Sequence, residues 1–288
     1  MRKRANDRTH GYLRPRDKRL NGARSQSSIG KSIARNEISQ MNVIALIPAR
    51  LASTRFPNKP LANILGKSML QHIVERVLLC DEINEVAVAT CDQEIIDHVE
   101  TLGYKAVMTS NTHERASDRC AEAVSKLEKS EKSSYDIVVM VQGDEPMTDP
   151  RMLSDVLRPF SNQPNLEVVN LYADIQPGEF KSPNCVKVVM DLAGNALYMS
   201  RAAIPVSQDG VERPSGKQLG LIAFKRHTLQ RFTELTPTPL EINESVDMLR
   251  FLEHGVPIRM QRTIYRTHAV DIPSDIAEVE RLMSTQAN

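Results

Sequence analysis

The chain has 288 residues, of which 41% are hydrophobic and 25% are charged, and its formal net charge is +1. These proportions are those of an ordinary globular protein, and the length suffices for one large domain or two small ones. No apolar run approaches the ~20 residues of a membrane-spanning helix, and the N-terminal residues lack the apolar segment of a secretory signal. We therefore expect a cytoplasmic protein that does not associate with a membrane.

The positive net charge is unevenly distributed along the chain. Residues 1–40 carry 11 Lys/Arg and 3 Asp/Glu, whereas residues 41–288 carry 26 and 33. The first forty residues are also poor in aliphatic side chains, so they cannot bury enough apolar surface to offset their ordering entropy. We predict that residues 1–40 form a disordered basic extension. The simplest explanation for this segment is a misassigned start codon, with Met41 as the true start. An organelle presequence or a nucleic-acid-binding arm are alternatives. The acidic residues in the segment argue against a presequence. The net negative charge of residues 41–288 argues against binding of nucleic acid, which it would repel.

From Met41 onwards, strand-like and helix-like segments alternate, which predicts a mostly parallel α/β sheet. We expect Pro48 to end the first strand, because proline cannot donate to a sheet ladder. Ser68 and Gln71 form a capping-box pattern that begins a helix. The expected strands are 42–47, 85–90, 105–108, 136–141 and 167–173, and the expected helices are the one after Ser68, 93–102, 117–129 and 150–160.

The pattern changes in the second half of the chain. Residues 186–190 and 196–199 flank a turn and read as a β-hairpin, and residues 201–216 read as a mobile loop rich in proline and glycine. A strand at 218–224 and a helix at 226–235 follow. Thr238, Pro239 and Glu241 mark the start of a helix over 239–254. The chain ends with a strand at 258–263 and a helix at 275–284 that Ser274 is expected to cap.

A cationic loop, residues 48–60, follows the first strand directly. It carries Arg50, Arg55 and Lys59, the hydroxyls of Ser53 and Thr54, and no acidic residue. A loop after a buried strand lies at the carboxyl edge of the sheet, where α/β folds bind ligands. Its charge predicts an anionic ligand, most simply a nucleotide triphosphate. The loop matches neither the Walker A nor the Gly-x-Gly-x-x-Gly pattern, and a solvated basic loop is the alternative.

Two carboxylates could complete such a site. Asp144 follows the most apolar strand, and Asp271 precedes the last helix. An acidic group beside bound phosphates is favourable when a cation lies between them, and Mg²⁺ uses one or two protein carboxylates together with phosphate oxygens. The pair therefore suits metal-assisted phosphoryl or nucleotidyl transfer, although each residue alone fits an ordinary turn.

Residues 113–119 allow two interpretations. Ser117 could cap a helix while Arg115 and Arg119 face the crevice, or the segment could be a charged helix start with internal ion pairs.

Other catalytic arrangements find little support. The cysteines are widely spaced without a Cys-x-x-Cys pair, which disfavours a zinc site or a disulfide framework. The histidines within helical patterns show no metal-ligand spacing, and no Ser/His/Asp or Cys/His set stands out. The four cysteines are Cys80, Cys91, Cys120 and Cys185.

The motifs occur in the order seen in one known family. They lie at residues 47–50, 53–55, 57–60, 66–69, 141–146, 186–189, 196–201, 239–241 and 270–271. Together they resemble the 3-deoxy-manno-octulosonate cytidylyltransferases, also called CMP-Kdo synthetases. The resemblance covers residues 42–284 and implies a three-layer, Rossmann-like nucleotidyltransferase fold with a mixed, mostly parallel sheet. It also implies a homodimer formed through an inserted element at about 186–222, and a role in lipopolysaccharide or capsule biosynthesis.

The resemblance also assigns site residues. It implies that the CTP phosphates are held by four residues of the cationic loop, Arg50, Ser53, Arg55 and Lys59. It places cytidine near Gln142 and the backbone of Ala49, and it counts Arg119 among the nucleotide-binding residues. It places Mg²⁺ on Asp144 and Asp271, which with Lys59 form the catalytic set. The sugar acid is expected near Ser200, Arg201, Gln218, Asp247 and Met248.

Departures from the family pattern concentrate around the sugar. A histidine associated with the sugar is replaced by Gln218, and a glutamine near the sugar is replaced by Met248. The family usually has Ser-Gly-Thr at residues 115–117, and its usual glycine at position 58 is Asn58, which accepts positive φ. We therefore expect transfer of CMP from CTP to a 3-deoxy-2-ulosonic acid, Kdo or a close variant. The alternatives are the same chemistry on a nonulosonic acid, a metal-dependent glycosyltransferase, or a non-catalytic nucleotide-binding regulator.

Overall fold

The computed structural model describes residues 41–53, 55–176, 178–206, 208 and 216–286. The predicted basic extension and most of the predicted mobile loop lie outside these residues. Within the described part of the chain, nine strands form one sheet, and seven of them lie in the order β11-β7-β10-β6-β1-β4-β5. The nine are β1 (Val43–Ala49), β4 (Glu85–Thr90), β5 (Lys105–Met108), β6 (Ile137–Val141), β7 (Val168–Asp174), β8 (Lys187–Met190), β9 (Ala196–Ser200), β10 (Gly216–Lys225) and β11 (Arg259–Arg262).

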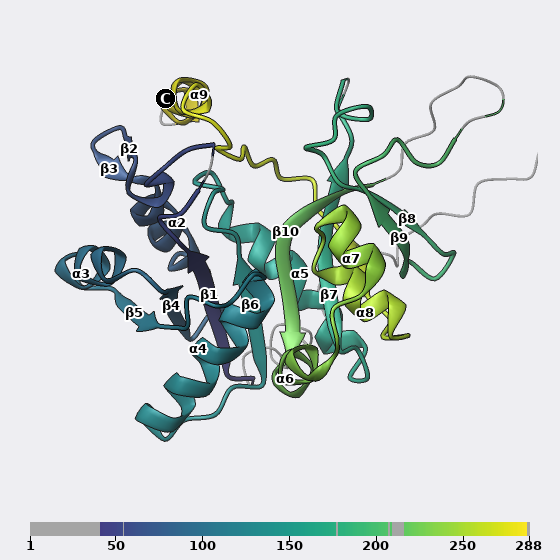
Figure 1. The fold of residues 1–288 in the computed structure, drawn as a ribbon, viewed down its shortest axis with the longest axis horizontal. Coiled ribbons are helices and arrows are strands. Elements are labelled where there is room, and N and C mark those ends of the chain that lie inside the picture. Colours follow the sequence, from purple (N-terminus) through teal and green to yellow (C-terminus); the bar gives the residue numbers. More distant parts are fainter. Residues whose placement is uncertain (1–40, 54, 177, 207, 209–215, 287–288) are drawn as a thin grey trace, which may run out of the picture.

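Strand direction in this sheet is mixed but mostly parallel, as predicted. β1 pairs in parallel with β4 and β6, β4 with β5, and β7 with β11. β10 runs antiparallel between β6 and β7. The hairpin of β8 and β9 branches off β10 and projects from the main sheet (Figure 1). The fold class expected from the alternating pattern is therefore confirmed.

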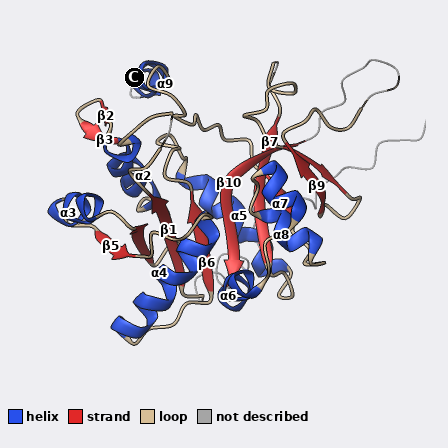
Figure 2. Cartoon of the chain, viewed as in Figure 1, coloured by secondary structure: helices blue, strands red, loops and turns tan. Residues whose placement is uncertain are grey.

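Helices cover both faces of the sheet and give the fold three layers (Figure 2). One apolar core contains buried residues of α2, α3, α5 and α9, and the other contains those of α4, α6 and α8. The C-terminal helix α9 lies beside the β2–β3 hairpin. The bounds are η1 Lys59–Leu61, β2 Asn63–Ile64, β3 Lys67–Ser68, α2 Met69–Val77, α3 Gln93–Thr101, α4 Ala116–Glu131, α5 Pro150–Asn162, α6 Arg226–Glu234, α7 Pro239–Glu244, α8 Met248–Glu253 and α9 Asp275–Gln286.

The first strand continues through Pro48 to Ala49, so the prediction that Pro48 ends it was wrong. Pairing of β1 with β6 stops at Leu46, whereas pairing with β4 runs on to Ala49. The Pro48 carbonyl faces Gly143, on the side where β6 has already ended. Pro48 therefore lies beyond the part of β1 that pairs with β6, where its missing N–H interrupts no pairing with that strand.

The predicted helix over 239–254 is two helices, α7 and α8, separated at Ser245. Ser245 has φ 52° and ψ 52°, a left-handed conformation that ends α7. The predicted start is correct, because Thr238 and Glu241 form a capping box. Ser117 lies inside α4 and does not cap it, since the residue at the N-cap position is Arg115.

No helix in the described ranges combines the length and apolar character needed to cross a membrane.

Candidate active site

The carboxyl ends of β1 and β6 open onto one pocket of about 400 Å³, which we call the cationic pocket. Its wall includes the cationic loop, the start of α4 and the turn after β6. Five of its side chains are Arg or Lys and two are carboxylates, so it suits an anion. The predicted nucleotide-binding residues all line it: Ala49, Arg50, Ser53, Arg55, Lys59, Arg119 and Gln142.

The cationic loop is held in place by contacts at its base. The Leu51 N–H donates to Asp92 Oδ2 at 2.7 Å, which ties the loop to the end of β4. The Asn58 N–H donates to the Leu51 carbonyl at 3.2 Å and closes the loop. Asn58 has φ 57°, which asparagine tolerates better than most residues. These hydrogen bonds fix the backbone of the loop, so the positions of its Arg and Lys residues are defined.

Both predicted metal-binding carboxylates contact cations of this loop. Lys59 Nζ lies 2.9 Å from Asp144 Oδ2, and Arg55 lies 3.4 Å from Asp271 Oδ1. Lys59 also donates to the Val270 carbonyl, and the Val270 N–H donates to the Asp144 carbonyl. Lys59 thus meets segments that lie 85 and 211 residues away in the sequence. Within the described residues no group of three or more His, Cys, Asp or Glu forms a metal cage. Asp144 lines the cationic pocket, and Asp271 lies beside it at the Arg55 side chain. Two carboxylates so close to an anion pocket suit Mg²⁺, which completes its shell with substrate oxygens and water.

Gln142 stands between the cationic pocket and a second cavity of about 730 Å³, which we call the adjoining pocket. Asp144 and Asp271 both line the adjoining pocket, together with Arg201, Lys217 and Gln218. A Cβ atom at Gly220 would lie 2.1 Å from Gln142 Cγ, so only glycine leaves room for the Gln142 side chain. The two pockets consequently share a wall whose position depends on Gly220.

The predicted sugar-binding residues divide into two groups. Arg201, Gln218, Asp247 and Met248 line a recess of about 160 Å³ that shares its wall with the adjoining pocket. Ser200 lies behind this wall, 2% exposed, and its hydroxyl donates to Glu244 Oε1 at 2.6 Å. Ser200 therefore holds Glu244 behind the wall of the recess, and this burial favours a structural role over contact with a ligand.

Two cations near the recess have no carboxylate within ion-pair distance among the described residues. Arg201 donates from its guanidinium to the carbonyls of Glu244, Pro183 and Ser245. Lys187 is fully buried and donates to the carbonyls of Ser182, Cys185 and Arg201. Burial lowers the pKa of Lys187. Sequence reasoning assigned Lys187 no role, although a lysine inside the apolar run Val-Lys-Val-Val was an available signal.

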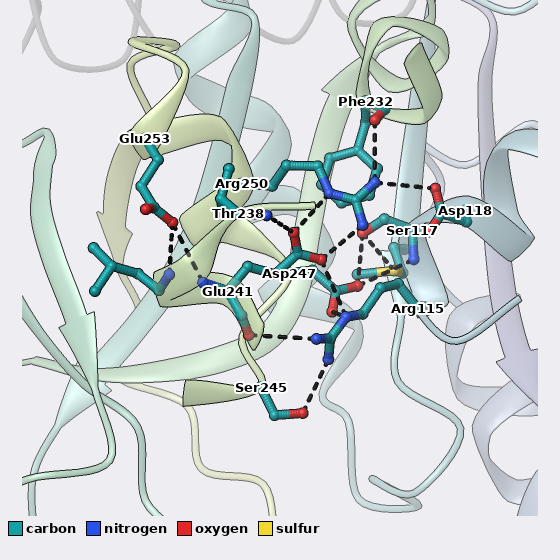
Figure 3. Close-up of polar contacts among 12 residues, drawn as sticks. Arg115, Ser117, Asp118, Phe232, Thr238, Glu241, Ser245, Asp247, Arg250 and Glu253 are labelled. Carbon is teal, nitrogen blue, oxygen red and sulfur yellow. Dashed lines mark hydrogen bonds and ion pairs between the residues drawn. The ribbon is translucent and has the colours of Figure 1, made fainter. Parts of the chain in front are cut away.

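The start of α4 contributes buried polar groups that were only partly anticipated (Figure 3). Arg119 is buried and donates to Thr109 Oγ1 at 2.6 Å, so it supports the pocket wall. Ser117 donates from its hydroxyl to Asp247 Oδ2 at 3.0 Å. The side chain of Asp247, predicted for the sugar, is thus also a structural link between α4 and the turn before α8.

Glu145 is a further carboxyl group that sequence reasoning missed. Its desolvation, and then the neighbouring Asp144 carboxylate, raise the pKa of Glu145 to about 7. Glu145 lines the adjoining pocket beside Lys217. Because Glu145 is close to Asp144 and Asp271, a cation bound in this pocket would favour the ionised form of Glu145 as well.

Comparison with known proteins agrees with this geometry. A family model described as Cytidylyltransferase matches residues 44–278. The chain is 44% identical over 232 residues to a 3-deoxy-manno-octulosonate cytidylyltransferase of Oleidesulfovibrio alaskensis, covering 80% of this chain and 92% of that protein. It is 37% identical over 246 residues to a protein of the same name from Zea mays, covering 84% of this chain and 81% of that protein.

Solved structures give the same result. CMP:2-keto-3-deoxy-manno-octonic acid synthetase complexed with CTP has a TM-score of 0.77 at 36% identity, covering 85% of this chain and 99% of that chain. A 4-diphosphocytidyl-2C-methyl-D-erythritol synthase from Anaerococcus prevotii has a TM-score of 0.55 at 14% identity, covering 85% of this chain and 99% of that chain. The second likeness concerns the fold alone.

Proposed function

The chain belongs to the cytidylyltransferase family, and from this premise we propose that it transfers CMP from CTP to the anomeric hydroxyl of 3-deoxy-manno-octulosonate, releasing pyrophosphate. The observation that carries the proposal is the convergence of two pockets at Gln142 and Asp144. One pocket is cationic and suits a triphosphate. The other contains Arg201, which has no carboxylate within ion-pair distance among the described residues, and it suits a sugar acid.

For CTP, we assign the triphosphate to Arg50, Ser53, Arg55 and Lys59, which line the cationic pocket together. Three cations near the β- and γ-phosphates would stabilise the negative charge that develops on the leaving pyrophosphate. Gln142, Arg119 and the backbone of Ala49 are assigned to cytidine, since they form the inner wall of the same pocket.

For the metal, we assign Mg²⁺ to Asp144, which lines both pockets, and Asp271, which lines the adjoining pocket. When bound, Mg²⁺ supplies charge neutralisation at the phosphates and lowers the pKa of the attacking hydroxyl. Lys59 contacts Asp144 and the Val270 carbonyl, so it fixes the relative position of the two carboxylate-bearing segments.

For the acceptor, Arg201 is assigned to the sugar carboxylate and Gln218, Asp247 and Met248 to the remaining wall. Acceptor binding there places the anomeric oxygen next to the α-phosphorus. That oxygen forms the new bond to phosphorus, the bond between the α- and β-phosphates breaks, and pyrophosphate leaves with its electron pair.

We extend the proposal to a homodimer formed through residues 186–222. The hairpin of β8 and β9 projects from the sheet and exposes apolar side chains, with Leu192 at 110% and Leu197 at 62% of their reference areas. Exposed apolar side chains on a projecting hairpin are typical of an interface. A cytoplasmic location is also proposed, because all four cysteines are free thiols.

Pyrophosphate release, measured with CTP and Mg²⁺ over a panel of sugar acids, tests the proposal. We expect release with 3-deoxy-manno-octulosonate. Release only with a nonulosonic acid would assign the same chemistry to another acceptor, for which the changed residues Gln218 and Met248 are the specific reason to test. CTP binding without turnover on any acid would contradict the proposal and indicate a nucleotide-binding regulator.

A further inference from the structure

The turn between α7 and α8, residues 244–247, forms part of the recess next to the adjoining pocket. Ser245 within it has the left-handed φ of 52°. A non-glycine residue in this conformation is strained and persists only where surrounding contacts support it. The position of the recess wall therefore depends on whichever side chains hold this turn.

Arg201 holds the turn from the side of the recess. Its backbone N–H donates to Glu244 Oε2 at 2.8 Å, and its Nε donates to the Glu244 carbonyl at 2.7 Å. Its Nη2 donates to the Ser245 carbonyl at 3.4 Å.

Arg115, which lines the cationic pocket, also holds the turn. Figure 3 shows its contacts with Glu241 and Ser245. Its Nη1 donates to Ser245 Oγ at 2.9 Å, and its Nε donates to Glu241 Oε1 at 3.1 Å. Its Nη2 donates to the Glu241 carbonyl at 3.3 Å. The Asp247 carboxylate lies 4.0 Å from Nε. One side chain thus touches the end of α7, the turn and the cationic pocket.

Glu241, to which Arg115 is bound, stays in place without Arg115. The carboxylate of Glu241 is fully buried and also receives two bonds from Arg250, at 2.8 and 2.7 Å. Arg250 in turn lies over the Phe232 ring, 4.0 Å from its centroid. Loss of Arg115 therefore leaves Glu241 paired, and the fold avoids the cost of a buried unpaired charge.

Arg115 retains capacity for a ligand. A guanidinium has five N–H donors, and three of them are used by Glu241 and Ser245. The side chain is 16% exposed, and it lines the cationic pocket together with Arg119. Its contacts differ from those of a simple surface ion pair because its partners Ser245 and Asp247 line the recess.

We propose that Arg115 is a positioning residue that fixes the 244–247 turn against the cationic pocket and thereby sets the affinity for the sugar acid. The inference rests on the proposed function, because it assumes that the recess holds the acceptor. Arg115 places Ser245 and Asp247, two hydrogen-bonding groups of the recess wall, at a fixed distance from the nucleotide. Specificity for the acceptor then depends on a residue that approaches from the nucleotide side.

The test compares Arg115→Ser and Arg115→Lys with the wild type in the pyrophosphate-release assay. Loss of a charged hydrogen-bond donor predicts about a tenfold rise in KM for the sugar acid in Arg115→Ser. KM for CTP should change less than about threefold, and Arg115→Lys should recover part of the loss because it keeps the charge. Thermal unfolding checks that both variants remain folded.

Arg226→Ser provides a matched control. Arg226 is 19% exposed, pairs with Glu128 at 2.8 Å and bonds Ser125, but lies outside both pockets. The Arg226→Ser variant should leave the KM for CTP and the KM for the sugar acid unchanged. An unchanged KM for the acid in Arg115→Ser, or an equal rise in both KM values, overturns the inference. A wild-type enzyme that turns over no acid overturns the proposed function, and this inference with it.

Discussion

The ammonium group of Lys59 lies 2.9 Å from Asp144 Oδ2 and 2.9 Å from the Val270 carbonyl. A single lysine therefore joins the cationic loop, the turn after β6 and the segment that carries Asp271. Because Lys59 belongs to the same loop as Arg50 and Arg55, the proposed phosphate site and the two carboxylates are mechanically linked. This contact brings together three segments that are not adjacent in sequence, and the proposed active site lies around it.

Asp144→Asn should lower kcat by about 100-fold or more, because it removes a charge needed at the reacting phosphate. CTP affinity measured without Mg²⁺ should change much less, since the cations of the loop remain. Steady-state kinetics at saturating Mg²⁺ and titration calorimetry give the two numbers. Asp97→Asn on the exposed surface of α3, where the Asp97 carboxylate accepts a hydrogen bond from Gln93 Nε2, is the matched control. Near-normal turnover of Asp144→Asn would remove Asp144 from the proposed metal site.

Lys187→Met should affect both stability and acceptor binding. The substitution keeps the apolar volume but leaves the carbonyls of Ser182, Cys185 and Arg201 without their shared donor. Removing a buried, hydrogen-bonded cation predicts a loss of about 3 kcal/mol in the free energy of unfolding. It also removes a positive charge beside Arg201, so KM for the sugar acid should rise more than KM for CTP.

Urea denaturation and steady-state kinetics measure the two effects of Lys187→Met. Lys105→Met, which replaces a lysine paired with Glu85 and Glu131 on edge strand β5, should change neither KM value. If Lys187→Met is folded and binds the acid as tightly as wild type, the buried charge serves stability alone.

The regular part of the fold could be predicted because its pattern is local. The strands at 85–90 and 105–108 have the predicted ends, since each is an apolar run bounded by polar residues. The site residues that follow strands, such as Asp144, were identifiable because parallel strands end at one edge of a sheet.

The features that were missed depend on tertiary contacts. The break at Ser245 has no turn sequence of its own, and Arg115 and Arg201 from distant segments hold it. The apolar run around Lys187 is a sequence signal for its burial, but its three carbonyl partners, from Ser182, Cys185 and Arg201, are brought around it only by the fold. Physical reasoning on sequence alone therefore located the cationic pocket better than the recess.

Stability at acidic pH should depend on Glu122. Burial acts to raise the pKa of Glu122, but hydrogen bonds from Lys126, the Ser110 N–H and His113 outweigh it and lower the pKa to about 2. A carboxyl group whose pKa is lower in the folded state stabilises the protein above its unfolded pKa, near 4.5. That contribution is lost as the pH falls from about 4.5 to about 2.

Glu122→Gln should therefore reduce the free energy of unfolding at pH 7 by about 2 kcal/mol, a figure that allows for solvent screening. The difference from wild type should shrink as the pH is lowered towards 2. Urea denaturation at several pH values measures it, and Glu94→Gln on the exposed surface of α3 is the control. A difference that stays constant from pH 7 to pH 3 would contradict the assignment to this carboxylate.

Gly220→Ala should impair catalysis through Gln142. A Cβ at position 220 would lie 2.1 Å from Gln142 Cγ, so the Gln142 side chain must leave the wall between the two pockets. Because Gln142 lines both pockets, its displacement should raise KM for CTP and for the acid, each by about tenfold. The main chain of β10 at Gly220 does not have a left-handed φ, so alanine adds no backbone strain there.

A double-mutant cycle distinguishes this route from a general disturbance of the sheet. If Gly220→Ala acts only by moving Gln142, then Gln142→Ala should produce a similar loss, and the double variant should be no worse than either single one. Steady-state kinetics on the three variants gives the coupling. Additive losses would mean that the alanine methyl group acts through β6 or β7 instead, and that Gln142 keeps its place in the shared wall.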